Sequence, residues 1–380
     1  IAEKELLALS KNYRAIAVVG PRQSGKTTLV RKCFPGKAYV NLENTDTRRF
    51  AIEDPRGFLS GFPHGAILDE VQRVPEIFSY LQQVLDENNT KGQFILTGSN
   101  NFLLQQNISQ TLAGRVGYLF LFPLSLQELD HPFPSTDALI YRGFYPEIYA
   151  DKEMDAGKYY SNYIRTYVER DVRMIKNIVD LYTFERFVRL CAGRTGQLLN
   201  MNSLAIEAGV DNKTVASWLS VLETSFIVFR LQPYHKSFNK RIVKMPKLYF
   251  YDTGLASALL GIDNKEQLGL HPSRGALFEN MVVVEFLKNR FNSGKMNNLF
   301  FWRDNVGTEI DLLIENSESL IPVEIKSGQT ITDAYFKSIT TWCKISGIDK
   351  GWVIYAGNQT QKRSNGITVL PYTEIGTFQP

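Results

Sequence analysis

The chain has 380 residues, of which 44% are hydrophobic and 22% charged, and its formal net charge is +4. This length allows two or three domains, and the composition is that of a globular protein rather than a disordered or fibrous one. No apolar run approaches the ~20 residues that a membrane-spanning helix needs. We therefore expect a protein without a membrane partner.

The cysteines Cys33, Cys191 and Cys343 form an odd, widely spaced set, and the four histidines are equally scattered. Neither spacing is that of a disulfide framework or a zinc site. Free thiols are typical of a reducing compartment, and the first residues are charged rather than apolar as in a secretion signal. We expect a cytoplasmic protein.

Residues 20–27, Gly-Pro-Arg-Gln-Ser-Gly-Lys-Thr, match the phosphate-binding pattern G-x-x-x-x-G-K-[ST]. The apolar segment 15–19 predicts a buried strand before them, and 28–32 predicts the first turns of a helix after them. This context distinguishes a phosphate-binding loop from a chance glycine turn. The residues expected to bind ATP in this region are Gly20, Pro21, Arg22, Gln23, Ser24, Gly25, Lys26, Thr27 and Thr28.

The residue types of this loop predict their roles. Glycines let successive N–H groups surround phosphates, and the helix N-terminus adds partial positive charge. We expect Lys26 to reach the β- and γ-phosphates as a catalytic group, and the Thr27 hydroxyl to ligate Mg²⁺. The chain has no guanine-reading N-K-x-D motif, which favours ATP over GTP.

Residues 65–70 predict a short apolar strand that ends in two carboxylates, Asp69 and Glu70. We expect Asp69 to hold Mg²⁺ through water and Glu70 to polarise the attacking water as a catalytic base. Such a pair can simply be solvated, but its position downstream of the loop favours the functional interpretation. Glu70 indicates hydrolysis rather than the reaction of a small-molecule kinase.

Polar residues also follow the predicted strand 93–98. Thr97, Ser99 and Asn100 are candidates to sense the γ-phosphate, with Ser99 counted among the ATP-binding residues, because parallel strands present their C-terminal ends to the ligand. Arg115 follows a predicted helix end and is a candidate catalytic arginine finger, acting in cis or from a neighbouring subunit. The alternative is a surface arginine that caps the helix.

Strand and helix patterns alternate through residues 1–150, which we expect to form a P-loop ATPase domain. Helical spacing, as in 75–85, separates the strands and predicts a three-layer α/β domain with a mostly parallel sheet. The predicted strands are 15–19, 38–42, 66–69, 93–98 and 117–122.

Residues 151–262 predict a helical lid and a winged-helix region, because a helix-turn-helix at 202–222 precedes strands at 226–231 and 248–251. Residues 151–250 carry 16 Lys and Arg against 10 Asp and Glu, an excess that suggests DNA or RNA as partner. Such a unit can instead contact protein. The expected phosphate contacts of the wing are Lys236, Lys240, Arg241, Lys244 and Lys247, and Lys213 and Thr214 face either a groove or solvent.

Residues 263–380 predict a smaller α/β domain. An apolar helix at 275–287 precedes strands at 299–303, 309–314 and 320–326, and the chain continues with a helix at 334–346 and a strand at 351–355.

Asp311, Glu324 and Lys326 on these strands form D-x₁₂-E-x-K. Glu324 and Lys326 face the same side of a strand, and two carboxylates can hold a divalent ion. We expect Glu279 on the preceding helix to add a ligand and Lys326 to orient water, as in restriction-endonuclease-like nucleases. Acidic residues and a lysine on edge strands can also serve only solubility.

Taken together, the chain resembles a large bacterial and archaeal family of AAA-type P-loop ATPases with a C-terminal region of nuclease-like character. The resemblance implies ATP binding, hydrolysis and a cytoplasmic location, and it supplies no substrate. Candidates for an arginine sensor in the helical segment are Arg165, Arg170 and Arg173. The matching stretches are 19–27, 68–73, 96–99, 112–115, 167–172 and 323–326.

Two functions are consistent with these patterns. The first is an ATP-driven enzyme that moves a winged helix and a nuclease-like domain on nucleic acid. The second is an ATP-gated signalling protein or scaffold that controls a protein partner or its own assembly, with a catalytically inactive C-terminal domain.

Overall fold

The structure is a computed structural model that describes residues 1–98, 108, 110–130, 132–168, 180–235, 243–316 and 319–378. Contacts between residues divide the chain into two compact units. The first comprises 1–123, 224–226 and 290–296, and the second comprises 124–223, 227–289 and 297–380.

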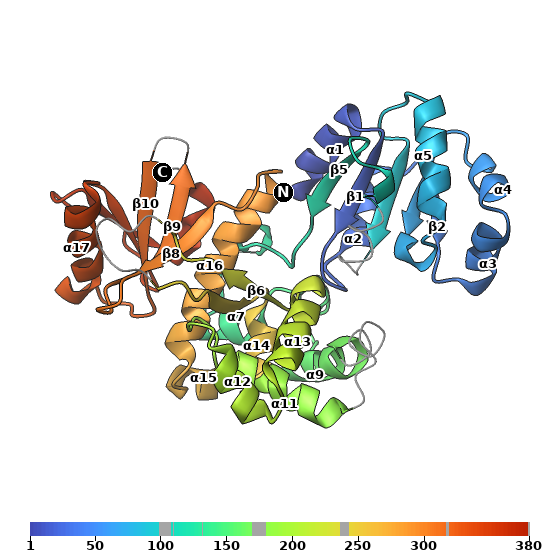
Figure 1. Cartoon of the computed structure of the whole chain (residues 1–380). Coiled ribbons are helices and arrows are strands. Elements are labelled where there is room, and N and C mark those ends of the chain that lie inside the picture. The colour runs from blue at the N-terminus through green and yellow to red at the C-terminus, as the bar shows by residue number, and fades with distance from the viewer. Residues whose placement is uncertain are drawn as a thin grey trace. The chain divides into compact units, whose positions relative to one another are not determined.

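The first unit is built on a five-stranded sheet in the order β2-β3-β4-β1-β5, in which every neighbouring pair is parallel. The predicted α/β fold with a parallel sheet flanked by helices is confirmed (Figure 1). The strands are β1 Ala15–Val19, β2 Ala38–Asn41, β3 Ala66–Asp69, β4 Phe94–Gly98 and β5 Val116–Phe120, and the helices are α1 Ala2–Asn12, α2 Lys26–Cys33, α3 Thr45–Glu53, α4 Pro55–Ser60 and α5 Ile77–Glu87.

Strand β1 lies between β4 and β5, and all five of its residues are buried. Its sequence is apolar at every position because a strand of a parallel sheet has both faces covered. Leu6 of α1 and Val30 of α2 belong to the same buried cluster as Ile16 and Val18. The C-terminal end of β1, where the glycine loop begins, is thus fixed by packing on both sides.

The second unit begins with a helical part. Helices α12 and α13 are joined through Gly209, whose φ of 76° suits glycine, and each helix has a side-chain cap, from Asn200 and Asp211. An antiparallel hairpin of β6 and β7 follows. The elements are α7 Thr136–Arg142, α8 Pro146–Ala150, α9 Ala156–Tyr163, the π-helix Ile164–Val168, α11 Leu181–Ala192, α12 Met201–Ala208, α13 Asn212–Thr224, β6 Val228–Leu231, β7 Lys247–Phe250, α14 Thr253–Leu259 and α15 Lys265–Leu270.

The rest of the second unit is a six-stranded sheet in the order β12-β13-β11-β10-β9-β8. Strands β8, β9 and β10 form an antiparallel meander, and β10 pairs in parallel with β11 after a crossover through α17. The predicted order of helix, three strands, helix and strand is confirmed. The elements are α16 Arg274–Asn292, β8 Leu299–Arg303, β9 Glu309–Asn316, β10 Ser319–Lys326, α17 Lys337–Ser346, β11 Gly351–Tyr355, β12 Gln361–Lys362 and β13 Ile367–Pro371.

A buried cluster joins α17 to this sheet. Trp342 of α17 packs with Trp302 of β8 and Leu313 of β9, and all three are fully buried. Burial of such large side chains contributes roughly 1.5–3 kcal/mol each. In the part of the chain that the structure describes, we find no helix with the length and apolarity that a membrane crossing requires.

Candidate functional site

The glycine loop at residues 20–25 connects the buried end of β1 to the first residue of α2. Gly25 has φ 90°, in the left-handed region that only glycine adopts readily. A Cβ atom at Gly20 would lie 2.0 Å from the carbonyl oxygen of Leu121, so any side chain there would force the backbone apart. The two glycines of the motif are therefore required by the backbone itself.

Ser24 of this loop and Lys26 directly after it are buried polar residues. The Lys26 side chain is buried, and its Nζ donates to the carbonyl oxygens of Gly20 at 3.0 Å and Pro21 at 2.6 Å. The Ser24 Oγ is buried without a hydrogen-bond partner. An ammonium and an unsatisfied hydroxyl at a helix N-terminus suit a phosphate group.

Asp69, the last residue of β3, accepts hydrogen bonds from hydroxyl groups of neighbouring elements. Its carboxylate accepts from Thr27 Oγ1 at 3.0 Å, from Tyr39 of β2 at 2.6 Å and from Thr97 of β4. Burial and the bond to Asp69 raise the pKa of Tyr39, which therefore stays a neutral donor. Asp69, Thr27 and Thr97 meet as the sequence indicates. Tyr39 is an addition, and Ser99 and Asn100 lie outside the described residues.

Glu70 follows Asp69 in the left-handed region, with φ 55°. For a non-glycine residue this conformation costs about 1–3 kcal/mol and is concentrated at functional sites. The Gln72 Nε2 donates to Glu70 Oε2 at 2.5 Å, and the Gln72 side chain is buried with its Oε1 unpartnered. Gln72 thus fixes the direction of the Glu70 carboxylate, a role that no pattern in the sequence indicates.

Arg115 lies at the N-terminal end of the parallel strands, whereas the glycine loop lies at their C-terminal end. Strands β1 and β5 run in parallel with Ala15 opposite Val116, so Arg115 precedes β5 while the loop follows β1. A strand of five residues separates these two ends by about 17 Å. Arg115 therefore cannot serve the loop of its own chain in this fold.

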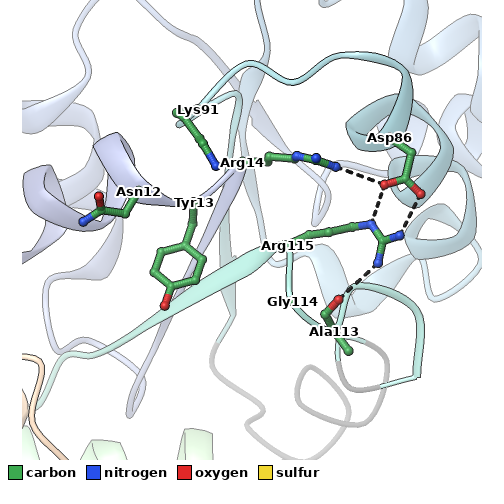
Figure 2. A pocket seen from close by; sticks show the side chains of 8 residues that line it. All are labelled: Asn12, Tyr13, Arg14, Asp86, Lys91, Ala113, Gly114 and Arg115. Carbon is green, nitrogen blue, oxygen red and sulfur yellow. Dashed lines mark hydrogen bonds and ion pairs between the residues drawn. The ribbon is translucent and has the colours of Figure 1, made fainter.

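Arg115 lines a pocket of about 360 Å³ at the N-terminal end of the strands. Figure 2 shows the side chains that line this pocket. The Nε and Nη2 atoms of Arg115 contact the carboxylate of Asp86 on α5 at 2.6 and 2.8 Å, and Arg14 contacts the same carboxylate at 3.1 Å. The bonds from Arg115 lower the pKa of Asp86. The guanidinium is held in one orientation on an open face of the unit.

In the second unit the structure brings Asp311, Glu324 and Lys326 together. Lys326 Nζ lies 2.6 Å from Glu324 Oε1 and 3.9 Å from Asp311 Oδ2, which also accepts the Ile325 N–H at 2.8 Å. Both carboxylates are largely buried, and Glu324 Oε2 has no hydrogen-bond partner. The predicted proximity of the D-x₁₂-E-x-K side chains is confirmed.

Glu279 of α16 joins this group through Lys247. The Lys247 Nζ lies 2.9 Å from Glu279 Oε1 and 2.5 Å from Glu309 Oε1, and the Tyr249 hydroxyl donates to Glu279 Oε1 at 2.5 Å. We use the term acidic cluster for Glu279, Glu309, Asp311 and Glu324. Glu309 and Tyr249 have no signal in the sequence beyond their positions on strands.

The expectation that Lys247 contacts phosphates from a loop is wrong. It is the first residue of β7, only 2% exposed, and its charge is neutralised inside the protein. Lys244 is exposed. Lys236, Lys240, Arg241, Arg170 and Arg173 lie outside the described residues.

Burial governs the protonation of the acidic cluster. It raises the pKa of Glu324 to about 8, with help from the charge of Asp311, and that of Glu279 to about 6. Burial on its own would lower the pKa of Lys247, but its interactions with Tyr249 and the surrounding carboxylates raise it well above its usual value. Within the described ranges, no three Asp, Glu, His or Cys side chains are arranged to hold a metal ion.

Family models cover nearly the whole chain in three parts. The AAA domain matches residues 12–130, and two domains of unknown function, DUF8612 and DUF4143, match 134–266 and 274–375. With the parallel sheet and the glycine loop, these matches define the class: the protein is an AAA-type P-loop ATPase.

Relatives then identify the family. The chain is 30% identical over 366 residues to uncharacterized proteins of Mycobacterium tuberculosis (Rv2008c) and Mycobacterium bovis (Mb2031c), covering 95% of this chain and 81% of theirs. The chain belongs to the family of these mycobacterial proteins. A Walker-type ATPase of Pyrococcus abyssi superposes with a TM-score of 0.47 and 15% identity, over 68% of this chain and 94% of that one.

Proposed function

We propose that ATP is bound at the glycine loop and hydrolysed there by residues of the first unit. The observation that supports this most strongly is the convergence of Thr27, Tyr39 and Thr97 on Asp69 beside the Lys26 loop. Loop N–H groups and Lys26 would hold the phosphates, and Thr27 and Asp69 would hold Mg²⁺. The metal ion, when bound, neutralises charge on the phosphates. Glu70, oriented by Gln72, would polarise the attacking water.

We further propose that Arg115 acts on ATP bound by a neighbouring copy of the chain. Its position at the end of the strands opposite the glycine loop supports action in trans and not in cis. The pocket around it is open, and Asp86 and Arg14 hold its side chain in place. A homo-oligomer would therefore be the active form.

For the second unit we propose a winged helix that binds DNA or RNA. The sequence of helices α11, α12 and α13 followed by the β6–β7 hairpin supports this assignment. Lys213 at the start of α13 is exposed. Residues 151–250, which include it, carry the largest excess of Lys and Arg over Asp and Glu in the chain. The strand order β11-β10-β9-β8 with α16 and α17 supports a restriction-endonuclease-like fold for the C-terminal part.

ATP turnover in the presence and absence of nucleic acid tests this function. We expect double-stranded DNA or RNA at low salt to increase phosphate release by about tenfold or less, with the increase falling as salt rises because phosphate contacts are screened. Lys213→Ala should reduce the stimulation and Lys32→Ala, in the first unit, should not. Turnover that ignores both nucleic acids, together with no binding at low salt, would contradict the proposal.

A second candidate is the ATP-gated scaffold, and one observation favours it. Tyr182 of α11 and Ile206 of α12 are 78% and 81% exposed, and exposed side chains of this size suit a protein contact better than a phosphate backbone. Oligomerisation that depends on the bound nucleotide, without any response to nucleic acid, would favour this candidate.

A further inference from the structure

The acidic cluster contains its own cation. Lys247 reaches it from β7, while Glu279 comes from α16 and Glu309 and Asp311 come from β9. The Lys247 Nζ lies within 2.9 Å of two of these carboxylates, and its side chain is 3% exposed. An ammonium so enclosed is a fixed positive charge among groups that would otherwise repel one another.

The oxygen atoms do not fit a divalent ion in this arrangement. Glu279 Oε1 already accepts from both Lys247 and Tyr249, and Glu309 Oε1 is taken by Lys247. Lys326 occupies Glu324 Oε1, which leaves the buried Oε2 of Glu324 unpartnered. A divalent ion needs several carboxylate oxygens at once, and two nearby ammonium groups would repel it.

We infer that the Lys247 ammonium takes the place of a metal ion in the acidic cluster, and that the cluster binds no divalent ion while Lys247 is present. The lysine also joins β7 to β9 and α16, so the cluster fastens the hairpin to the C-terminal sheet. This inference does not depend on a nucleic-acid partner.

The test is a Mn²⁺ titration in which electron paramagnetic resonance measures the free and bound Mn²⁺. The full chain is used without nucleotide and with Thr27→Ala, so that the glycine loop contributes no metal site. We expect no saturable Mn²⁺ binding up to about 1 mM. Saturable binding that Glu279→Gln or Asp311→Asn abolishes would overturn the inference.

A double variant tests the role of Lys247 directly. Lys247→Met alone leaves Glu279 with only the Tyr249 hydroxyl and Glu309 with only Arg303 as partner, a loss of charge pairing that can prevent folding. Glu309→Gln is therefore combined with it. We expect the Lys247→Met/Glu309→Gln protein to gain a Mn²⁺ site at least about tenfold tighter than any weak binding of the parent. Lys244→Met, which changes an exposed lysine on the same segment, should gain nothing. A folded double variant without a new site would equally refute the replacement.

Discussion

Lys26 has its charge satisfied by two carbonyl groups of its own loop, an arrangement that a phosphate would have to replace. We predict that Lys26→Ala lowers affinity for ATP by about tenfold or more, since a charge-assisted bond to phosphate contributes about 1.5–3 kcal/mol. Isothermal titration with a non-hydrolysable ATP analogue measures this.

Lys32→Ala is the matched control for Lys26→Ala, because Lys32 lies on the same helix and pairs only at the surface with Glu3. Its affinity for the analogue should equal that of the parent. Equal affinities of the two variants would remove Lys26 from the site.

At this scale the sequence predicts best where a motif dictates backbone geometry. Gly20, Gly25 and Lys26 could be assigned because the motif requires their residue types. Tyr39 could not, because its contact with Asp69 depends on which strands are neighbours in the sheet. Gln72 could not, because its contact with Glu70 depends on the left-handed backbone at Glu70. Lys247 was misassigned because its neighbours in the sequence are basic, whereas its neighbours in space are carboxylates of β9 and α16.

Among the elements, α16 carries a buried carboxyl that should make stability depend on pH. Glu285 is 1% exposed, and burial raises its pKa to about 7, against the opposing charge of Lys288. Between about pH 4.5 and 7 the folded protein binds this proton and the unfolded chain does not, so stability falls as the pH rises through that window.

We predict that Glu285→Gln removes up to about 3 kcal/mol of this dependence between pH 5 and 8. The amide keeps an acceptor for the Leu126 N–H, which Glu285 Oε1 accepts at 2.9 Å. Urea unfolding at several pH values measures the slope, and Glu266→Gln on the exposed helix α15 is the control. An unchanged slope in Glu285→Gln would show that this carboxyl titrates normally.

Helices and strands of the chain follow largely from local patterns. Strand β1 and the strands β8 to β11 could be located because their apolar residues have strand spacing and lie between helical segments. The strand β12 is not among the predicted elements, because Gln361–Lys362 is too short and polar to give a signal. The strand β13 is also not among them, although Ile367–Pro371 is largely apolar.

For the whole molecule, the proposed action of Arg115 on ATP bound by a neighbouring copy would make turnover depend on two chains. We predict that Arg115→Ala and Lys26→Ala are each inactive alone, with at least about a hundredfold loss of turnover. Mixing the two proteins should restore part of the activity, because an intact loop then meets an intact arginine at some interfaces. Phosphate release at increasing mixing ratios measures this, and a mixture as inactive as its components would argue against a shared site.

The most direct test of the proposed ATPase mechanism is to compare ATP hydrolysis by the parent protein and by Glu70→Gln, and to measure nucleotide binding by both proteins in parallel. We predict that the parent releases phosphate in the presence of Mg²⁺, and that Glu70→Gln binds ATP with similar affinity but hydrolyses it at least about a hundredfold more slowly. Phosphate release by Glu70→Gln at the rate of the parent would contradict the assignment of Glu70 as the residue that activates water.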